Sequence, residues 1–531
     1  MVKKFVLLLI ITTGLFLRVA GADWGFPFLV HPDESVVAEI PIQMVERSTL
    51  DPGEYSHPDH FDIYANALLY LAASHLVYHK PLAETFENHK LLFYHTSRIF
   101  VAILGIACII AAFFIGEEYG GNTGLIAAML VAIFPSYVTH SHFITADIPL
   151  TLFVLSVILF TVRYLKNASN KDLLTASFFS ALAVSVKYPG VLTLLLILSA
   201  IVCKNYRNKK VLFVKSLKAI TTFVFILFIS SPYLFINWFR VIQALYVNAT
   251  PVHLGADGLD WHGTMLFYAK NYFDFSGCLV TIFFGLGTFY IIKIEKMLAI
   301  PMFFGLFYWI VLSKLGLHWE RWALPMYTCP LLVSAYGINY AYEKSLLAAR
   351  KFLFPLCCIS VLLIIVKLLL NSSVATANFT LRDTRFAAYT FAQEMGINEE
   401  NTLYEGYTPF YPANLLIGSI RDVYLTQNAN KNIRFIILSS AVYDRYLQEK
   451  GRYKTETEFY NKIFSLPLIK KFEHKEYLSQ TDHPFLLDND LARGVAFLFH
   501  YLRNKNELLS GPTILIYKYV SPGFLDHKNA L

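Results

Sequence analysis

The chain has 531 residues, of which 56% are hydrophobic and 16% are charged, and its mean hydropathy is +0.47. A soluble protein carries about 25% charged residues, so this composition excludes an ordinary soluble globular protein. The net charge is +7, but the basic residues lie in short clusters between apolar runs, without a basic stripe and stacking aromatics, and we therefore predict no nucleic-acid partner. The six cysteines form no CxxC pair, so neither a disulfide framework nor a zinc site is supported.

Eleven apolar runs predict a polytopic α-helical membrane protein, because about 20 apolar residues cross a bilayer. The predicted spans lie near residues 4–21, 92–115, 121–137, 146–164, 172–187, 189–203, 213–235, 272–292, 297–313, 322–341 and 351–370. Within 172–203, the sequence KYPG from Lys187 permits either a turn between two helices or a bend in one. The first run ends near a small-residue motif typical of signal-peptide cleavage, but Arg18 interrupts it, and we favour an uncleaved helix.

The rest of the chain divides into a long loop and a soluble region. Residues 22–91 are rich in Asp, Glu, His and Tyr, with two stretches of helical apolar spacing that we expect along the membrane surface. From residue 371 the sequence alternates helix and strand patterns. We predict a transmembrane domain at 1–370 and an α/β domain at 371–531. The positive-inside rule places the N-terminus in the cytoplasm, and both the loop and the α/β domain outside the cell membrane.

Carboxylates stand at two of the predicted outer helix boundaries. Asp33 and Glu34 follow the first span in the sequence HPDE, and Asp147 precedes the fourth span in SHFITADIPL. A lone carboxylate at a membrane boundary commonly marks only the point where the chain leaves the bilayer and enters water. Two such positions on one face of the membrane instead indicate a single shared site.

These motifs, in this order, resemble the polytopic C-type glycosyltransferases, above all the family 39 group that includes protein O-mannosyltransferases and the aminoarabinose transferase of lipid A. The resemblance rests on Asp33 and Glu34, on His57-Pro58, on Asp147, and on the sequences ALAVSVKYPG, ERWALPMYTCPLL, LRDTRFAAYTFAQEMGINEENTLYEGYTPFYPA and RFIILSSAVYDRYL. Where members of this group often have His-Pro-Pro, the chain continues with Asp59, and the lysine-proline motif of the lipid A enzyme is missing. Aminoarabinose transfer is therefore not supported, and the sugar stays open.

The resemblance implies transfer of a sugar from a polyprenyl- or dolichyl-phosphate donor to an acceptor protein, lipid or glycan at the outer face. The acceptor hydroxyl needs a base, and Asp33 is the candidate in a single inverting displacement. Glu34 is the candidate supporting acid, and Asp147 the second catalytic carboxylate. His57 and Asp59 are candidates for the acceptor or loop site.

The leaving phosphate needs positive charge on its oxygens. Arg321, at the outer end of the tenth span, is the first candidate, because a guanidinium can grip two oxygens at once; its alternative role is an anchor between Trp319 and Trp322. Lys187 is the second candidate, with a turn lysine as the alternative. Arg98, within the second span, is the third, with an ion pair inside the bundle as the alternative.

Three alternatives stay open. We assign no cofactor, but His31, His57 and His142 with neighbouring carboxylates are candidate ligands of a divalent metal ion, although no pair has a diagnostic spacing. The rival function is a membrane transporter or flippase of lipid-linked sugars, which is expected to show charges at mid-bilayer depth or an internal repeat. Here the acids lie at one membrane face and no repeat is found. A catalytically inactive paralogue that binds the lipid carrier is a third reading.

Overall fold

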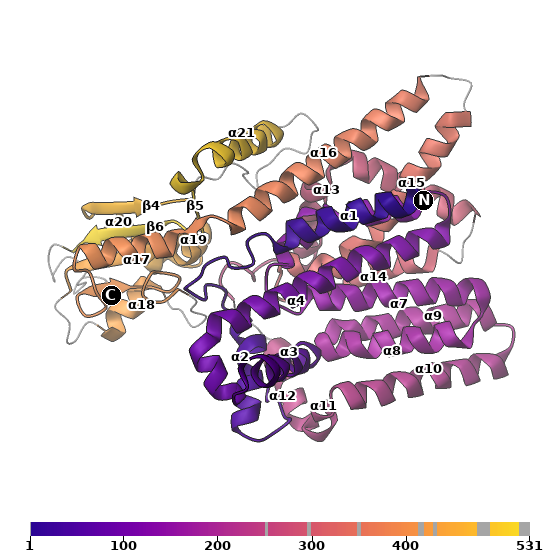
Figure 1. Cartoon of the computed structure of the whole chain (residues 1–531), viewed down its shortest axis with the longest axis horizontal. Coiled ribbons are helices and arrows are strands. Elements are labelled where there is room, and N and C mark those ends of the chain that lie inside the picture. The colour runs from indigo at the N-terminus through magenta and orange to yellow at the C-terminus, as the bar shows by residue number, and fades with distance from the viewer. Residues whose placement is uncertain are drawn as a thin grey trace.

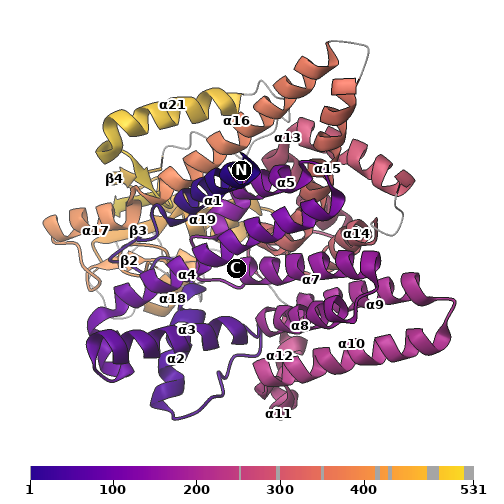
Figure 2. The ribbon, with the colours of Figure 1, turned by 45° about the vertical axis from the view of Figure 1, so that its right-hand side comes forward.

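Long apolar helices form one bundle, and a small sheet with its helices lies beyond one end of that bundle (Figure 1). The computed structural model describes residues 2–249, 253–294, 299–347, 352–412, 419–427, 433–474 and 489–519. The helices of loop 22–91 lie at the same end as the sheet, whereas the helix that begins at Val2 starts at the opposite end (Figures 1 and 2). The loop and the C-terminal region therefore share one side of the molecule.

Each predicted span coincides with a helix. The bundle contains α1 (Val2–Val19), α4 (Leu82–Tyr119), α5 (Thr123–Ala132), α6 (Pro135–His140), α7 (Asp147–Asn167), α8 (Asn170–Val186), η2 (Tyr188–Val191), α9 (Leu192–Asn205), α10 (Lys209–Ser230), α13 (Trp261–Ile294), α14 (Ile300–Leu312), α15 (Leu324–Leu347) and α16 (Leu353–Phe379). Six helices in the described part of the chain can cross a membrane by length and composition. The chain is a multi-pass membrane protein; because α5 and α14 are shorter apolar helices, the count of eleven crossings stays a prediction.

Two boundaries are more definite in the structure than in the sequence. Residues 172–203 form two helices, and Gly190 lies in the turn between them, so close to Ala183 that a Cβ would collide with its backbone. The last bundle helix, α16, continues to Phe379, beyond the predicted end at residue 370. The C-terminal region consequently begins with a helix that it shares with the bundle.

The remaining elements lie outside the bundle. They are α2 (Glu34–Glu46), α3 (His60–Ala73), η1 (Ser74–Tyr78), α11 (Tyr233–Ile236), α12 (Trp238–Ala249), η4 (Glu320–Ala323), α17 (Thr384–Glu394), α18 (Ile420–Gln427), α19 (Ser440–Gln448), α20 (Lys454–Phe464), α21 (Asn489–Asn504) and η5 (Lys505–Glu507), with strands β1 (Arg382–Asp383), β2 (Thr402–Tyr404), β3 (Phe435–Ser439), β4 (Leu468–Phe472), β5 (Leu509–Ser510) and β6 (Ile514–Lys518). The larger sheet has the order β2-β3-β6-β4, with β2 parallel to β3 and the other pairs antiparallel. Alternate residues of β3 enter two different cores, Ile436 on one face and Ile437 on the other, as expected for a sheet covered on both faces.

Two glycines allow α13 and α15 to cross at close range. A Cβ on Gly287 of α13 would collide with the Val333 carbonyl oxygen of α15, and a Cβ on Gly337 of α15 would collide with the Phe283 carbonyl oxygen of α13. Small residues at helix crossings let backbones approach in membrane proteins, where packing replaces the hydrophobic effect as the driving force. This crossing fixes the middle of α15, the helix that follows the segment containing Arg321.

We predict that Gly287→Ala lowers stability by about 1–3 kcal/mol, because the added methyl group forces the two helices apart. Gly285→Ala is the matched control, since Gly285 lies on the same helix with no atom near its Cβ position; alanine there should be neutral or slightly stabilising. Thermal unfolding of the purified protein in detergent measures both. Equal unfolding temperatures of the two variants would contradict the close crossing of α13 and α15.

Candidate functional site

Four charged side chains meet where the bundle faces the C-terminal elements, and we call them the charged cluster: Asp33, Arg321, Asp147 and Lys187. Nη2 of Arg321 lies 2.6 Å from Oδ2 of Asp33, and its Nε lies 3.8 Å from Oδ2 of Asp147. Nζ of Lys187 donates a hydrogen bond of 3.0 Å to Oδ1 of Asp147. Acids and bases therefore alternate along the cluster. The structure brings together four candidates that are far apart in the sequence.

Helix ends position these four groups. Asp147 is the first residue of α7, where the helix dipole favours a negative charge. Lys187 follows the end of α8 in an extended conformation. Asp33 precedes α2, and Arg321 lies in the short helix η4. The polar groups thus stand where regular structure ends and the chain leaves the apolar bundle.

Tryptophans contact both cations. The guanidinium of Arg321 lies 5.7 Å from the ring of Trp319, and Nζ of Lys187 lies 5.3 Å from the ring of Trp322. Such cation–π contacts hold a cation in place while leaving its hydrogen-bond donors available. Arg321 is therefore more than an interfacial anchor, since it contacts both carboxylates as well as Trp319.

Exposure increases along the charged cluster. The Asp147 side chain is only 2% exposed and that of Lys187 10%, whereas those of Arg321 and Asp33 are 22% and 35% exposed. A ligand can consequently reach the cluster from its Asp33–Arg321 end. The Asp147–Lys187 pair forms the closed end.

The titratable groups beside the open end differ in charge. Burial raises the pKa of Asp33, but Arg321 and His31 outweigh it and bring this pKa below its ordinary value. Burial lowers the pKa of His31. Burial raises the pKa of Asp59 well above its usual value. At neutral pH Asp33 is therefore a carboxylate and His31 is neutral, whereas Asp59 holds its proton more strongly than a free aspartic acid does.

The candidate loop residues lie beside the closed end. The backbone N–H of Asp59 donates to the carbonyl of Val186, next to Lys187, at 3.0 Å. Asp59 is buried with a φ of +47°, whereas His57 is exposed. The loop therefore packs its acid against the bundle and leaves its histidine exposed.

The three histidines named as metal candidates do not come together with acids in a ligand set. The ring nitrogens of His142 lie 2.9 and 3.0 Å from the carbonyl oxygens of Val138 and Ala20, and its ring stacks on Phe379. Nδ1 of His31 accepts the backbone N–H of Asp33 at 3.3 Å. Across the described ranges, no group of three His, Cys, Asp or Glu side chains could hold a metal ion. These residues do not fit a metal, and we derive no step through one.

Arg98 and Glu34 form a fully buried ion pair. Two hydrogen bonds of 2.9 and 2.7 Å join the guanidinium to the carboxylate, and both side chains are 0% exposed. Arg98 also donates to the carbonyls of Ala22 and Trp24, while Glu34 accepts the backbone N–H of Ile144. The ion-pair role considered for Arg98 is thus the one that the structure shows, and Glu34 is its partner rather than a free supporting acid.

Two sets of contacts that the sequence did not indicate reach the open end from the C-terminal elements. Arg385 of α17, itself held by Asp383, donates to the carbonyl of Val30 at 3.3 Å, just before the segment that carries Asp33. Phe28 of the same loop contacts the rings of Phe386 and Tyr389 in α17. The segment carrying Asp33 therefore rests on the C-terminal region.

The second set leads to Arg321. Arg452 makes two hydrogen bonds, of 3.0 and 3.2 Å, to Asp257, and the neighbouring carbonyl of Ala256 accepts the N–H of His318 at 2.8 Å. His318 lies three residues before Arg321 in the sequence HWER. No local pattern marks either set, because each contact joins segments far apart in the chain.

We predict that Arg98→Met destabilises the protein by about 3–5 kcal/mol, because it leaves the Glu34 carboxylate buried without a counter-ion. The control is the double variant Arg98→Gln with Glu34→Gln. Its two neutral amides can hydrogen-bond to each other, so it should lose less stability than the single variant. Thermal unfolding in detergent tests both, and a single variant as stable as the unmodified protein would refute the structural role.

A family model described as dolichyl-phosphate-mannose-protein mannosyltransferase matches residues 53–247, which include His57, Asp147 and Lys187. No curated protein matches the chain.

Solved structures resemble the chain over most of its length. The oligosaccharyltransferase of Archaeoglobus fulgidus in the apo form has a TM-score of 0.52 at 10% identity, over 97% of this chain and 88% of that one. ArnT from Cupriavidus metallidurans in the apo state has a TM-score of 0.53 at 13% identity, over 85% and 95%. At such identities the likeness concerns the fold. The chain has the fold of these membrane proteins, and it resembles the C-type glycosyltransferases in both sequence and architecture.

Proposed function

We propose that the protein is a membrane glycosyltransferase that moves a sugar from a polyprenyl-phosphate-linked donor to an acceptor hydroxyl at the outer face of the membrane. The observation that carries the proposal is the charged cluster, in which a partly exposed carboxylate and a partly exposed guanidinium lie 2.6 Å apart at a helix boundary. A transferase of this kind needs both groups at one point, a base for the acceptor and positive charge for the phosphate.

In the proposed reaction, the acceptor oxygen attacks the anomeric carbon as the bond from this carbon to the phosphate oxygen breaks. The acceptor proton passes to Asp33, and the phosphate leaves with the bonding electron pair. Arg321 is the residue best placed to receive the phosphate, since its side chain is partly exposed at the open end and its Nε has no hydrogen-bond partner. Lys187 holds Asp147 and adds positive charge from the closed end.

The comparisons support the donor class. The matching family model is described by its dolichyl-phosphate-mannose donor, and a structure of the archaeal oligosaccharyltransferase AglB, with a TM-score of 0.51 at 11% identity, contains a dolichol-phosphate and an inhibitory peptide. We extend the lipid-phosphate donor to this chain, with a protein, lipid or glycan acceptor. The charged cluster and the C-terminal region then belong to the outer side, and the N-terminus to the cytoplasm.

The direct test is a transfer assay with the purified protein in liposomes that contain dolichyl- or undecaprenyl-phosphate sugars. Mass spectrometry follows both the released lipid phosphate and the glycosylated product. Appearance of both supports the proposal. Movement of intact lipid-linked sugar across the bilayer without bond cleavage would instead establish the flippase alternative.

We predict that Asp33→Asn lowers the transfer rate by about 10²–10⁴-fold, because the amide cannot accept the proton. Asp260→Asn is the control: this acid is 73% exposed, and asparagine can still accept the N–H of Gly263, so turnover should be nearly unchanged. Initial rates at saturating donor compare the two. A wild-type rate for Asp33→Asn would remove Asp33 from the role of base.

We predict that Arg321→Gln raises the donor KM and lowers turnover, with a loss on the order of 10²–10³-fold in total. Because Arg321 lowers the pKa of Asp33, its removal should also move the acidic limb of the pH–rate profile to higher pH, since Asp33 then takes up its proton earlier on acidification. Arg207→Ala, an exposed cation between α9 and α10 at the opposite end of the bundle, is the control. Unchanged kinetics and pH profile in Arg321→Gln would exclude the phosphate role.

A further inference from the structure

The residue directly before Arg321, Glu320, is bound by a helix of the bundle. Oε1 of Glu320 accepts a hydrogen bond from the hydroxyl group of Ser136 in α6. Oε2 of Glu320 lies 2.9 Å from Nε2 of His140, the last residue of α6. Ser136 and His140 are four residues apart, so they stand on the same face of that helix. Each oxygen of the Glu320 carboxylate therefore has a partner on one face of α6.

A further contact joins α6 to the end of the same segment. The hydroxyl group of Tyr137 donates a hydrogen bond of 2.9 Å to the carbonyl of Leu324, the first residue of α15. Residues 135–138 of α6 are buried, so packing inside the bundle holds this short helix in place. The short helix η4, which carries Arg321, is consequently fastened to α6 at its first residue and just beyond its last.

The direction of the Glu320 carboxylate matters for any anion that binds at Arg321. A carboxylate turned toward the guanidinium would compete with a phosphate for it, and it would repel the phosphate as well. In the structure, Ser136 and His140 hold this carboxylate at α6, and the guanidinium contacts Asp33 and Asp147. The contacts with α6 thus separate the charge of Glu320 from the anion-binding side of its neighbour.

We propose that Glu320 is a positioning residue for the donor phosphate, which holds the Arg321 guanidinium at the open end of the charged cluster through its bonds to Ser136 and His140. The inference rests on the proposed function, in which Arg321 receives the phosphate of a lipid monophosphate. A guanidinium grips two phosphate oxygens only in one orientation. A displacement of about 1 Å at such a group costs up to about 10²-fold.

The test measures binding of undecaprenyl phosphate to the full-length protein in detergent, together with thermal unfolding. Glu320→Ala should raise the Kd by about 10- to 10²-fold. Its unfolding temperature should change little, because the side chains of Glu320 and His140 are 22% and 13% exposed and such pairs contribute little to stability. Glu320→Gln should recover most of the affinity, since its amide can accept from Ser136 and bond to His140.

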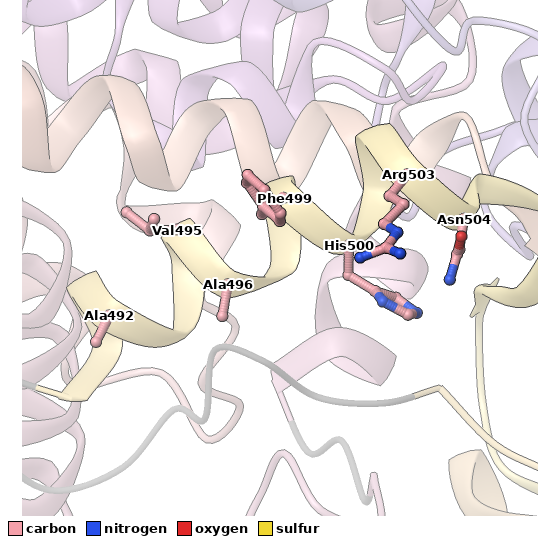
Figure 3. A pocket seen from close by; sticks show the side chains of 7 residues that line it. All are labelled: Ala492, Val495, Ala496, Phe499, His500, Arg503 and Asn504. Atoms are coloured by element: carbon pink, nitrogen blue, oxygen red, sulfur yellow. The ribbon is translucent and has the colours of Figure 1, made fainter.

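The matched control is Glu507→Ala, which should bind undecaprenyl phosphate like the unmodified protein. Glu507 is exposed, also lies in a short helix, η5, and accepts a hydrogen bond of 3.4 Å from the side chain of Asn504. Figure 3 shows Asn504 at one end of a hollow along α21. The control therefore removes the same carboxylate from a similar local structure in the C-terminal region.

A double-mutant cycle tests whether the effect passes through α6. Ser136→Ala should also raise the Kd, and Ser136→Ala combined with Glu320→Ala should bind no more weakly than Glu320→Ala alone, because both changes break the same contact. In the transfer assay, the donor KM should rise by the same factor as the Kd.

Three results would overturn the inference: a Kd unchanged in Glu320→Ala, a Kd in Glu320→Gln as high as in Glu320→Ala, or additive losses in the cycle. These results leave the proposed function intact as long as Arg321→Gln loses the lipid phosphate. Absence of binding by the unmodified protein would instead overturn the proposed function, and this inference with it.

Discussion

Mutual neutralisation of the charged cluster is the constraint on which the rest of the architecture depends. Asp147 and Lys187 are almost completely buried, and a buried charge without its partner costs about 3–5 kcal/mol. The start of α7, the end of α8 and the segment of η4 must therefore converge, since each contributes one member. The ion pair between Arg98 and Glu34 applies the same constraint to α2 and α4. Two networks of opposite charges thus fix the end of the bundle at which the site lies.

The C-terminal region completes what the bundle leaves open. The more exposed members of the cluster are Asp33, which directly precedes α2, and Arg321 in the short helix η4, and neither belongs to a long bundle helix. Arg385 donates a hydrogen bond to the carbonyl of Val30, in the loop before Asp33. Arg452 bonds to Asp257, and the carbonyl of the neighbouring Ala256 accepts the N–H of His318, just before η4. Irregular segments that carry functional groups need such support, because small displacements of a catalytic group are costly. This gives the C-terminal region a positioning role in the proposed transferase.

The sequence predicted what depends on local pattern. Apolar runs predicted the long bundle helices, and acids or bases at helix boundaries provided all four members of the charged cluster as candidates. The sequence did not predict which charged residues pair with each other. Nothing local indicates that Arg98 pairs with Glu34, 64 positions away, because pairing is a property of tertiary packing. The helix α21 was also missed, since its two apolar faces blur the single-stripe pattern by which an amphipathic helix is predicted. The extension of α16 escaped prediction because its last residues are polar, Asn378 among them.

The ion pair between Asp33 and Arg321 links the two halves of the proposed chemistry. In the free protein the guanidinium keeps the carboxylate ionised but weakly basic, because it lowers the pKa of Asp33. A donor phosphate at Arg321 competes for the same positive charge, and a carboxylate that loses part of its counter-ion becomes a stronger base. Asp147 changes less, since Lys187 still holds it. Donor binding thereby prepares Asp33 to accept a proton at the moment when an acceptor can use it, and the alternating order of the charges allows this exchange without leaving any group unpaired.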